Sequence, residues 1–207
     1  MKKLTKVLAV MLAVLMLGGV LAGCQEEQKK TTYRILDETL DAEQYAIGFR
    51  NADIALGLEV QKVMDEMLAD GTSAKISEKW FNGEDIMLKN ADYLEETKAP
   101  EGDQSLQKVL DKGTLVLGLD DSFPPMGFRD PDTNDIVGFD IDLANEVAKR
   151  LGVTLEVQPI NWDAKELELT TNRIDCIWNG MSVNEQRLKD MFMAKPYICL
   201  LYTSRCV

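Results

Sequence analysis

The chain has 207 residues, with 35 acidic and 23 basic side chains, no histidine and a formal net charge of −12. This balance argues against nucleic acid as a partner, because phosphate binding needs clustered lysine and arginine. The lack of histidine also removes the most common general base and metal ligand. We expect no metal and no cofactor. With 45% hydrophobic residues the chain can build the core of one or two domains.

The first 24 residues have the pattern of an export signal. Three lysines precede an apolar run from Val7 to Val20, which is shorter than the roughly 20 residues needed to span a bilayer. The sequence Leu-Ala-Gly-Cys that follows and ends at Cys24 resembles the bacterial lipoprotein box. We expect a signal peptide over residues 1–23, a lipid on Cys24 and a polar tether over residues 24–32. A plain signal peptide or a short anchor is the alternative.

The next segment, residues 33–85, is predicted to hold two short strands and two helices. The strands are Tyr33–Leu36 and Gln44–Arg50. Asp53 is a candidate cap for a helix that Gly71 ends, and apolar residues recur on one face of it, namely Leu56, Val60, Val63, Met64 and Met67. A second helix, Thr72–Phe81, is expected to bury Ile76, Trp80 and Phe81. Within the acidic stretch that follows, we place a linker over residues 86–103.

From residue 104 to 198, strands and helices alternate. We predict helices at Leu106–Lys112, Phe139–Leu151 and Ala164–Thr170, and strands at Thr114–Leu119, Ile136–Gly138, Thr154–Gln158 and Ile174–Trp178. This order implies βαβ crossovers, a parallel sheet and an α/β fold. Ligands of such sheets bind at the carboxyl ends of the strands. The residues that fall there are Asp120, Phe123, Trp162, Asn179, Ser182 and Arg187.

The run from Gly138 to Arg187 suits the binding of a free amino acid. A carboxylate needs a planar bidentate donor, which Arg187 supplies, and an ammonium needs oxygens nearby. Asn179, Gly180 and Ser182, followed by a helix start near Asn184, bring carbonyl, hydroxyl and backbone N–H groups to one point. The alternatives are a surface Arg187 paired with Glu185, a Ser182 that only caps the helix, and Trp162 or Phe123 as core residues.

The adjacent acids Asp120 and Asp121 resemble a catalytic carboxylate pair. Neighbouring residues in an extended loop point in opposite directions, however, and no nucleophile, histidine or metal cluster accompanies these two. We therefore expect that the protein is not an enzyme.

These residues carry a family resemblance. From Leu106 to Ile198 the chain resembles the first lobe of extracellular solute-binding proteins of polar amino acid ABC transporters, which are type II periplasmic binding proteins of family 3. The run GFDIDL at 138–143, with Val147, Ala148 and Leu151 after it, fits the family signature at every position. The resemblance implies a periplasmic-binding-protein-like lobe with a mostly parallel sheet flanked by helices.

The resemblance also implies roles for the site residues. Asp120 would face the ligand side chain, and Phe123 and Trp162 would form aromatic walls. Gly180 would offer its backbone N–H, Ser182 would contact the backbone end of the ligand, and Arg187 would grip its carboxylate. Asn179 stands where the family often has a small hydroxylated residue. In the family, an acid of the second lobe contacts the ammonium of the ligand. The resemblance assigns no residue of this chain to that role.

Residues 33–85 resemble the other end of the same family, namely the segment that returns through the hinge and the closing helices. The tail of the family therefore precedes its head, and the second lobe is largely missing. One account is a truncated tandem protein, which we favour as the origin. The other is a permuted lobe in which the linker joins the two pieces, which we favour as the way the chain folds.

Two cysteine-containing segments complete the chain. Cys176 lies in an apolar predicted strand and is expected to be a small buried residue. Residues 199–207 are predicted to be translated sequencing adapter, because the codons for Cys199–Ser204 resemble the transposon end used in library preparation. A real strand is the alternative.

The function implied by the resemblance is reversible binding of a small polar amino acid outside the cell and its delivery to an ABC permease. The protein would act as a lipid-anchored monomer that carries half of the ligand site. A dehydratase-type enzyme on the same scaffold and a sensory or interaction module are the alternatives.

Overall fold

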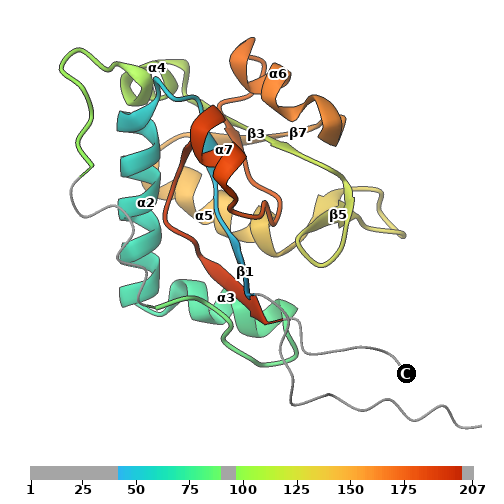
Figure 1. Cartoon of the computed structure of the whole chain (residues 1–207). Helices are drawn as coiled ribbons and strands as arrows, with labels where there is room; N and C mark the ends of the chain where they lie inside the picture. The colour runs from blue at the N-terminus through green and yellow to red at the C-terminus, as the bar shows by residue number, and fades with distance from the viewer. Residues whose placement is uncertain (1–41, 90–96, 202–207) are drawn as a thin grey trace, which may run out of the picture. The chain divides into compact units, whose positions relative to one another are not determined.

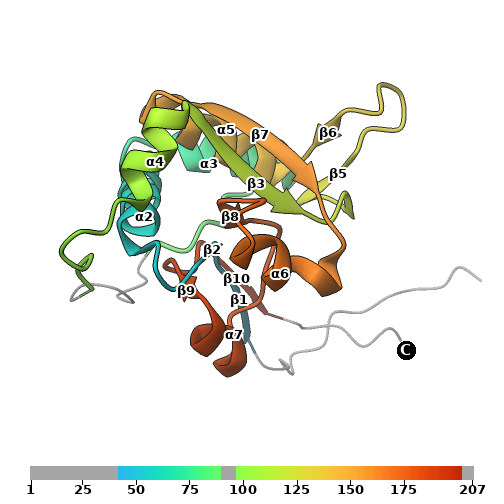
Figure 2. The same ribbon diagram turned by 90° about the horizontal axis from the view of Figure 1, so that it is seen from above.

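A five-stranded mixed sheet lies at the centre of the computed structural model, which describes residues 42–89 and 97–201. Its order is β7 (Thr154–Pro159), β3 (Thr114–Leu119), β8 (Cys176–Ile177), β2 (Gly48–Phe49) and β9 (Phe192–Met193). Strand β3 runs parallel to β7, as Figure 2 shows, and also to β8. Strand β2 runs antiparallel to β8 and β9. The α/β lobe is confirmed, and its sheet is mixed because β2 runs opposite to the other four strands.

Strand β3 shows how the core is divided between the two faces of the sheet. Its sequence TLVLGL is almost entirely apolar, as expected for a strand covered on both faces. Leu115, Leu117 and Leu119 point into the larger core cluster, whereas Val116 points into a second cluster. This is the two-residue alternation of a strand.

The helices cover the two faces of the sheet. Helices α2 (Ile54–Ala69) and α5 (Phe139–Leu151) supply the larger core, and α3 (Thr72–Trp80) packs against both (Figures 1 and 2). Helix α6 (Lys165–Thr170) follows the 3-10 turn η1 (Trp162–Ala164) and supplies Leu169 to the second cluster. The prediction of Phe139–Leu151 matches α5 to the residue, because Gly138 and Gly152 flank a regular apolar repeat.

The start of α2 differs from the prediction. Asp53 makes no capping hydrogen bond, because its carboxylate pairs with Arg50. The Ala55 N–H instead donates to the Asp103 carboxylate at 2.7 Å, and the Leu56 N–H donates to Ser105 Oγ at 3.0 Å. Helix α4 (Ser105–Lys112) begins at this point. Ser105 and the preceding Asp103 therefore cap a helix that lies about 50 residues earlier in the chain.

Several predicted boundaries also shift. The predicted strand Gln44–Arg50 is two strands, β1 (Ala42–Tyr45) and β2, and the predicted strand Ile174–Trp178 pairs only as β8. In α3 the fully buried residues are Ser73 and Ser77, whereas Ile76 and Trp80 are only partly buried because they cover the rim of the core. Cys176 is buried and unbonded, as predicted.

The last described strand, β10 (Ile198–Leu201), pairs antiparallel with β1. It includes residues 199–201 of the predicted adapter segment. Backbone pairing uses groups that any sequence supplies, so the adapter origin stays a prediction. The remaining residues of that segment, the signal peptide, Cys24, the tether and the predicted strand Tyr33–Leu36 lie outside the described residues. No helix within the described ranges is long and apolar enough to cross a membrane.

Three short strands complete the described fold. They are β4 (Ser122–Phe123), β5 (Gly127–Arg129) and β6 (Ile136–Val137), which form a separate antiparallel sheet. Phe123 lies four residues after the carboxyl end of β3, and Pro124 and Pro125 follow it in the turn to β5. Helix α7 (Glu185–Asp190) follows β8 and lies near β9. These loops and α7 provide most of the site described next.

Candidate functional site

One cavity of about 300 Å³ lies beyond the carboxyl ends of β3 and β8. This volume is at the lower end for small-molecule pockets. The cavity is lined by all of the residues that the sequence placed in the ligand site, namely Asp120, Phe123, Trp162, Asn179, Gly180, Ser182 and Arg187. Two residues from β1, Glu43 and Tyr45, line it as well. The predicted gathering of these side chains is confirmed.

The parallel strands account for most of this gathering. Asp120 directly follows β3, and Asn179 comes two residues after β8, so the two meet at one edge of the sheet. The Asp120 N–H donates to Asn179 Oδ1 at 3.1 Å, which joins the two strand ends. The Asn179 Nδ2 atom is buried and has no hydrogen-bond partner among the described residues. Phe123 is 38% exposed, so this wall of the cavity faces solvent.

The two adjacent acids do not act as a pair. Asp120 Oδ1 accepts hydrogen bonds from the Ser122 N–H at 2.9 Å and from Ser122 Oγ at 2.6 Å, so one oxygen braces the loop. Asp121 forms an ion pair with Arg129 at 2.6 Å. The two carboxylates therefore have separate partners, and this arrangement does not resemble an acid–base pair.

The backbone N–H of Gly180 is not directed to the ligand position, so that expectation is wrong. It donates to Asp140 Oδ2 at 2.7 Å, and Tyr197 OH donates to Asp140 Oδ1 at 2.8 Å. Burial raises the pKa of Asp140 to about 7, against the lowering effect of these hydrogen bonds. A fully buried carboxyl needs donors, and the Gly180 N–H is one of them. Gly180 still lines the cavity, and its φ is 53°.

The segment after Gly180 shows whether Ser182 only caps the next helix and whether Arg187 only pairs with Glu185. Asn184 caps α7, because its side chain accepts a hydrogen bond from the Arg187 N–H at 2.9 Å. Ser182 is therefore not the cap, and its hydroxyl donates to the Glu43 carboxylate. Arg187 Nη1 donates to the Ser182 carbonyl at 2.6 Å, which holds the guanidinium over the strand end. Within the described ranges Arg187 makes no ion pair, with Glu185 or any other acid.

Sequence reasoning missed Glu43 and Tyr45. Glu43 and Tyr45 are two positions apart in β1, so both lie on the same face of the strand. This face lines the cavity, because the chain from Gln44 to Ala46 runs antiparallel to the segment after β8. The Ala46 N–H donates to the Met181 carbonyl at 3.0 Å, and the Val183 N–H donates to the Gln44 carbonyl at 2.8 Å. The only sequence signal for this pairing was the short predicted strand, which does not name its partner.

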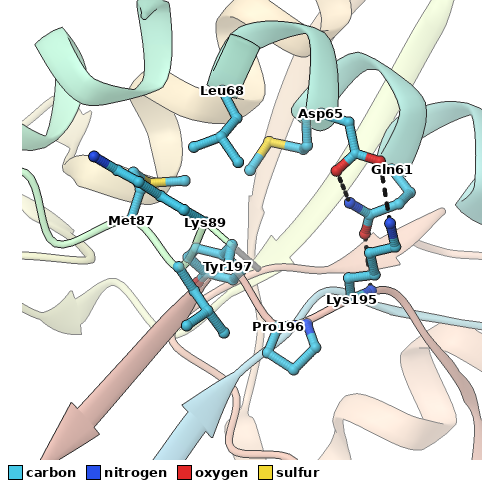
Figure 3. A pocket seen from close by; sticks show the side chains of 10 residues that line it. Gln61, Asp65, Leu68, Met87, Lys89, Lys195, Pro196 and Tyr197 are labelled. Carbon is cyan, nitrogen blue, oxygen red and sulfur yellow. Dashed lines mark hydrogen bonds and ion pairs between the residues drawn. The ribbon is translucent and has the colours of Figure 1, made fainter. Parts of the chain in front are cut away.

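A second cavity, of about 130 Å³, lies between α2 and the segment around Tyr197 (Figure 3). Three of its polar residues, Gln61, Asp65 and Lys195, are bonded to one another. Gln61 Nε2 donates to Asp65 Oδ1 at 2.9 Å, the Lys195 N–H donates to Gln61 Oε1 at 2.8 Å, and Lys195 Nζ lies 3.4 Å from Asp65 Oδ2. None of the predicted site residues lines it, so we place the candidate site in the larger cavity. Within the described part of the chain no group of three acids or cysteines is arranged to hold a metal ion.

Comparison with known proteins shows what the part of the chain that carries the cavity is similar to. Residues 115–205 match the family model of bacterial extracellular solute-binding proteins, family 3, and this range contains all seven predicted site residues. The L-cystine-binding protein TcyJ of Escherichia coli K12 is 35% identical over 92 residues, which cover 44% of this chain and 34% of that protein. The cyclohexadienyl dehydratase of Pseudomonas aeruginosa PAO1 is 28% identical over 93 residues, which cover 45% and 34%.

Among solved structures, the arginine-bound form of domain 1 from TmArgBP is 43% identical, with a TM-score of 0.38. The match covers 40% of this chain and 64% of that one. The chain spans about a third of the length of the curated relatives. The matches in sequence confirm the resemblance to extracellular solute-binding proteins of family 3 for residues 115–205, the part of the chain that carries the predicted site residues.

Proposed function

We propose that this protein binds a small polar amino acid reversibly outside the cell and delivers it to an ABC importer, without chemistry on the ligand. The observation that carries this proposal is the cavity itself. Seven residues predicted from sequence line it together, and Arg187 is held by the Ser182 carbonyl at 2.6 Å with no acid paired to it in the described ranges. A guanidinium with free N–H groups is the donor that a ligand carboxylate needs.

The cavity supplies one wall of the binding site. Family members of this kind close two lobes about a hinge and bury the ligand between them. Small-ligand sites usually bury about 70 to 90% of the ligand, and a site open on the side of Phe123 buries less. We therefore propose weak binding, with a Kd of about 1 mM, which corresponds to about 4 kcal/mol.

The fold supports the proposal that this lobe is permuted. Strand β2 of the tail-like segment lies between β8 and β9 of the head-like segment. Asp103 and Ser105, at the end of the linker, cap α2 of the tail-like segment. The two segments therefore share one core, because described residues of both belong to the same buried apolar cluster. Expression of the chain without residues 42–89 tests this proposal, because we expect that variant to lose β2 and remain unfolded.

The direct test of binding is a titration of the full chain with each of the common L-amino acids, followed by NMR of the backbone amides. We expect the amides of Asn179, Ser182 and Arg187 to shift at millimolar concentrations of at least one amino acid. No shift at tens of millimolar would contradict the proposal. Micromolar affinity in calorimetry would instead contradict the account of a half site that needs a second wall.

A dehydratase is the rival function, because one relative that matches this chain is a cyclohexadienyl dehydratase. Such an enzyme needs an acid or base that reaches its substrate. Asp120 is the one acid of the predicted site, and it braces its own loop through Ser122. We propose that the chain is not an enzyme, and measurement of turnover of a cyclohexadienyl acid tests this. Turnover that Asp120→Asn abolishes would favour the enzyme.

The anchor and the transport partner belong to the proposal as well. We propose that Cys24 carries a lipid, so that the monomer stays on the outer face of the cell membrane near its permease. Cys24→Ser should move the protein from the membrane fraction to the soluble fraction and abolish labelling with a radioactive fatty acid. Retention of Cys24→Ser in the membrane fraction would contradict a lipid anchor.

A further inference from the structure

Glu43 enters the cavity from a part of the chain remote from the other lining residues. Its carboxylate accepts a hydrogen bond from Ser182, which lies 139 residues later. The backbone pairing of β1 fixes this position, because Tyr45 bridges to Ser182 and turns to the same cavity. Glu43 lies outside residues 115–205, the range that matches the family.

Ser182 stands between two opposite charges. Its hydroxyl donates to Glu43, and its carbonyl accepts from Arg187 at 2.6 Å. Glu43 and Arg187 make no ion pair with each other or with another described residue, so neither charge is neutralised there. A carboxylate and a guanidinium on either side of one residue match the ammonium and carboxylate that a free amino acid carries on one carbon.

Asp120 is the other acid of the cavity, and its surroundings give it a different task. One of its oxygens holds two hydrogen bonds from Ser122, and it follows β3 on the side of Phe123. The Glu43 carboxylate receives one hydrogen bond from the described residues, through Oε1, so its second oxygen has capacity for a further donor.

We infer that Glu43 accepts the α-ammonium of the bound amino acid, while Arg187 holds the carboxylate and Asp120 faces the side chain. This inference rests on the proposed function. It makes the remote strand β1 part of the ligand site. It also gives the cavity two carboxylates and one guanidinium, a charge balance that favours an amino acid with a basic side chain.

The test compares L-amino acids with their α-hydroxy acids, in which a neutral hydroxyl replaces the ammonium. The full chain is titrated with L-arginine and argininic acid, and with L-alanine and lactate, and the Kd values are taken from NMR shifts of the Ser182 and Arg187 amides. We expect the amino acids to bind about tenfold more tightly than the hydroxy acids, since one charge-assisted hydrogen bond is lost.

Glu43→Gln removes the charge but keeps an oxygen that can accept from Ser182. It should reduce the preference for the ammonium to about twofold or less, with little change in hydroxy acid binding. Asp120→Asn is the matched control and should keep the preference for alanine over lactate. Glu43→Ala serves as a second variant if Glu43→Gln changes the amide spectrum of the core.

The outcomes separate the inference from the function. A preference that survives in Glu43→Gln and Glu43→Ala, or that Asp120→Asn removes, overturns the role of Glu43 while amino acid binding stands. Absence of binding of every compound by the unaltered chain overturns the proposed function, and the inference with it.

Discussion

Replacing Asp140 by asparagine should change how the stability of the protein depends on pH. Asp140 is fully buried, and burial raises the pKa of its carboxyl from 3.8 to about 7. In the unfolded chain the carboxyl has its ordinary pKa near 3.9. The folded state therefore holds a proton that the unfolded state has lost over this pH range. The contribution of this bound proton to the free energy of unfolding is fully present below about pH 4 and is lost as the pH rises through about 7.

The size of the effect follows from the linkage relation. Each pH unit between the two pKa values lowers the free energy of unfolding by about 1.4 kcal/mol, so the interval of about 3 units amounts to about 4 kcal/mol at most. The amide of asparagine resembles the neutral acid in shape. It can accept from the Gly180 N–H and donate to the Tyr197 oxygen, and it has no charge to bury.

The assay is urea unfolding of the parent protein and Asp140→Asn between pH 4.5 and 8. We expect similar stabilities near pH 4.5 and a growing advantage of the variant as the pH rises. The difference between the two proteins removes the contribution of all other titrating groups. A difference that does not change with pH would refute this reasoning. A variant that becomes less stable toward pH 8 would show that the two hydrogen bonds favour the charged carboxylate over the neutral one.

Three further predictions concern single residues. Arg187→Lys should weaken amino acid binding by about tenfold or more without changing the unfolding temperature, since lysine lacks the bidentate fork; an unchanged Kd in NMR titration would contradict the role of the guanidinium. Gly180→Ala should cost more stability than Gly71→Ala in thermal unfolding. Both have positive φ, but a Cβ at Gly180 would lie 2.8 Å from Phe123 Cε1, whereas at Gly71 nothing lies within 4 Å; equal costs would argue against a crowded cavity. Asp103→Ala should cost about 1 kcal/mol through the lost cap of α2, while the exposed Asp111→Ala should change stability by less than about 0.5 kcal/mol in urea unfolding; the reverse order would refute the cap.

The sequence determined the regular elements that depend on local pattern. The strand Thr114–Leu119 and the helix Phe139–Leu151 were predicted to the residue, since each has a strong apolar period and a glycine at its boundary. Six of the seven site residues, all except Gly180, followed from one rule, that parallel strands place their carboxyl ends at one edge. A helix start near Asn184 was predicted, and Asn184 is the cap of α7.

The tertiary structure alone decided what depends on partners far away in the chain. The cap of α2 comes from Asp103 and Ser105, and local preference pointed to Asp53 because a helix pattern does not show which distant acid reaches its first N–H groups. The Gly180 N–H goes to Asp140, a partner 40 residues earlier that only packing brings into contact. Glu43 reaches the cavity because β1 pairs with the segment after β8. Strand pairing uses backbone groups common to all residues, so a sequence pattern can name a strand but not its neighbour.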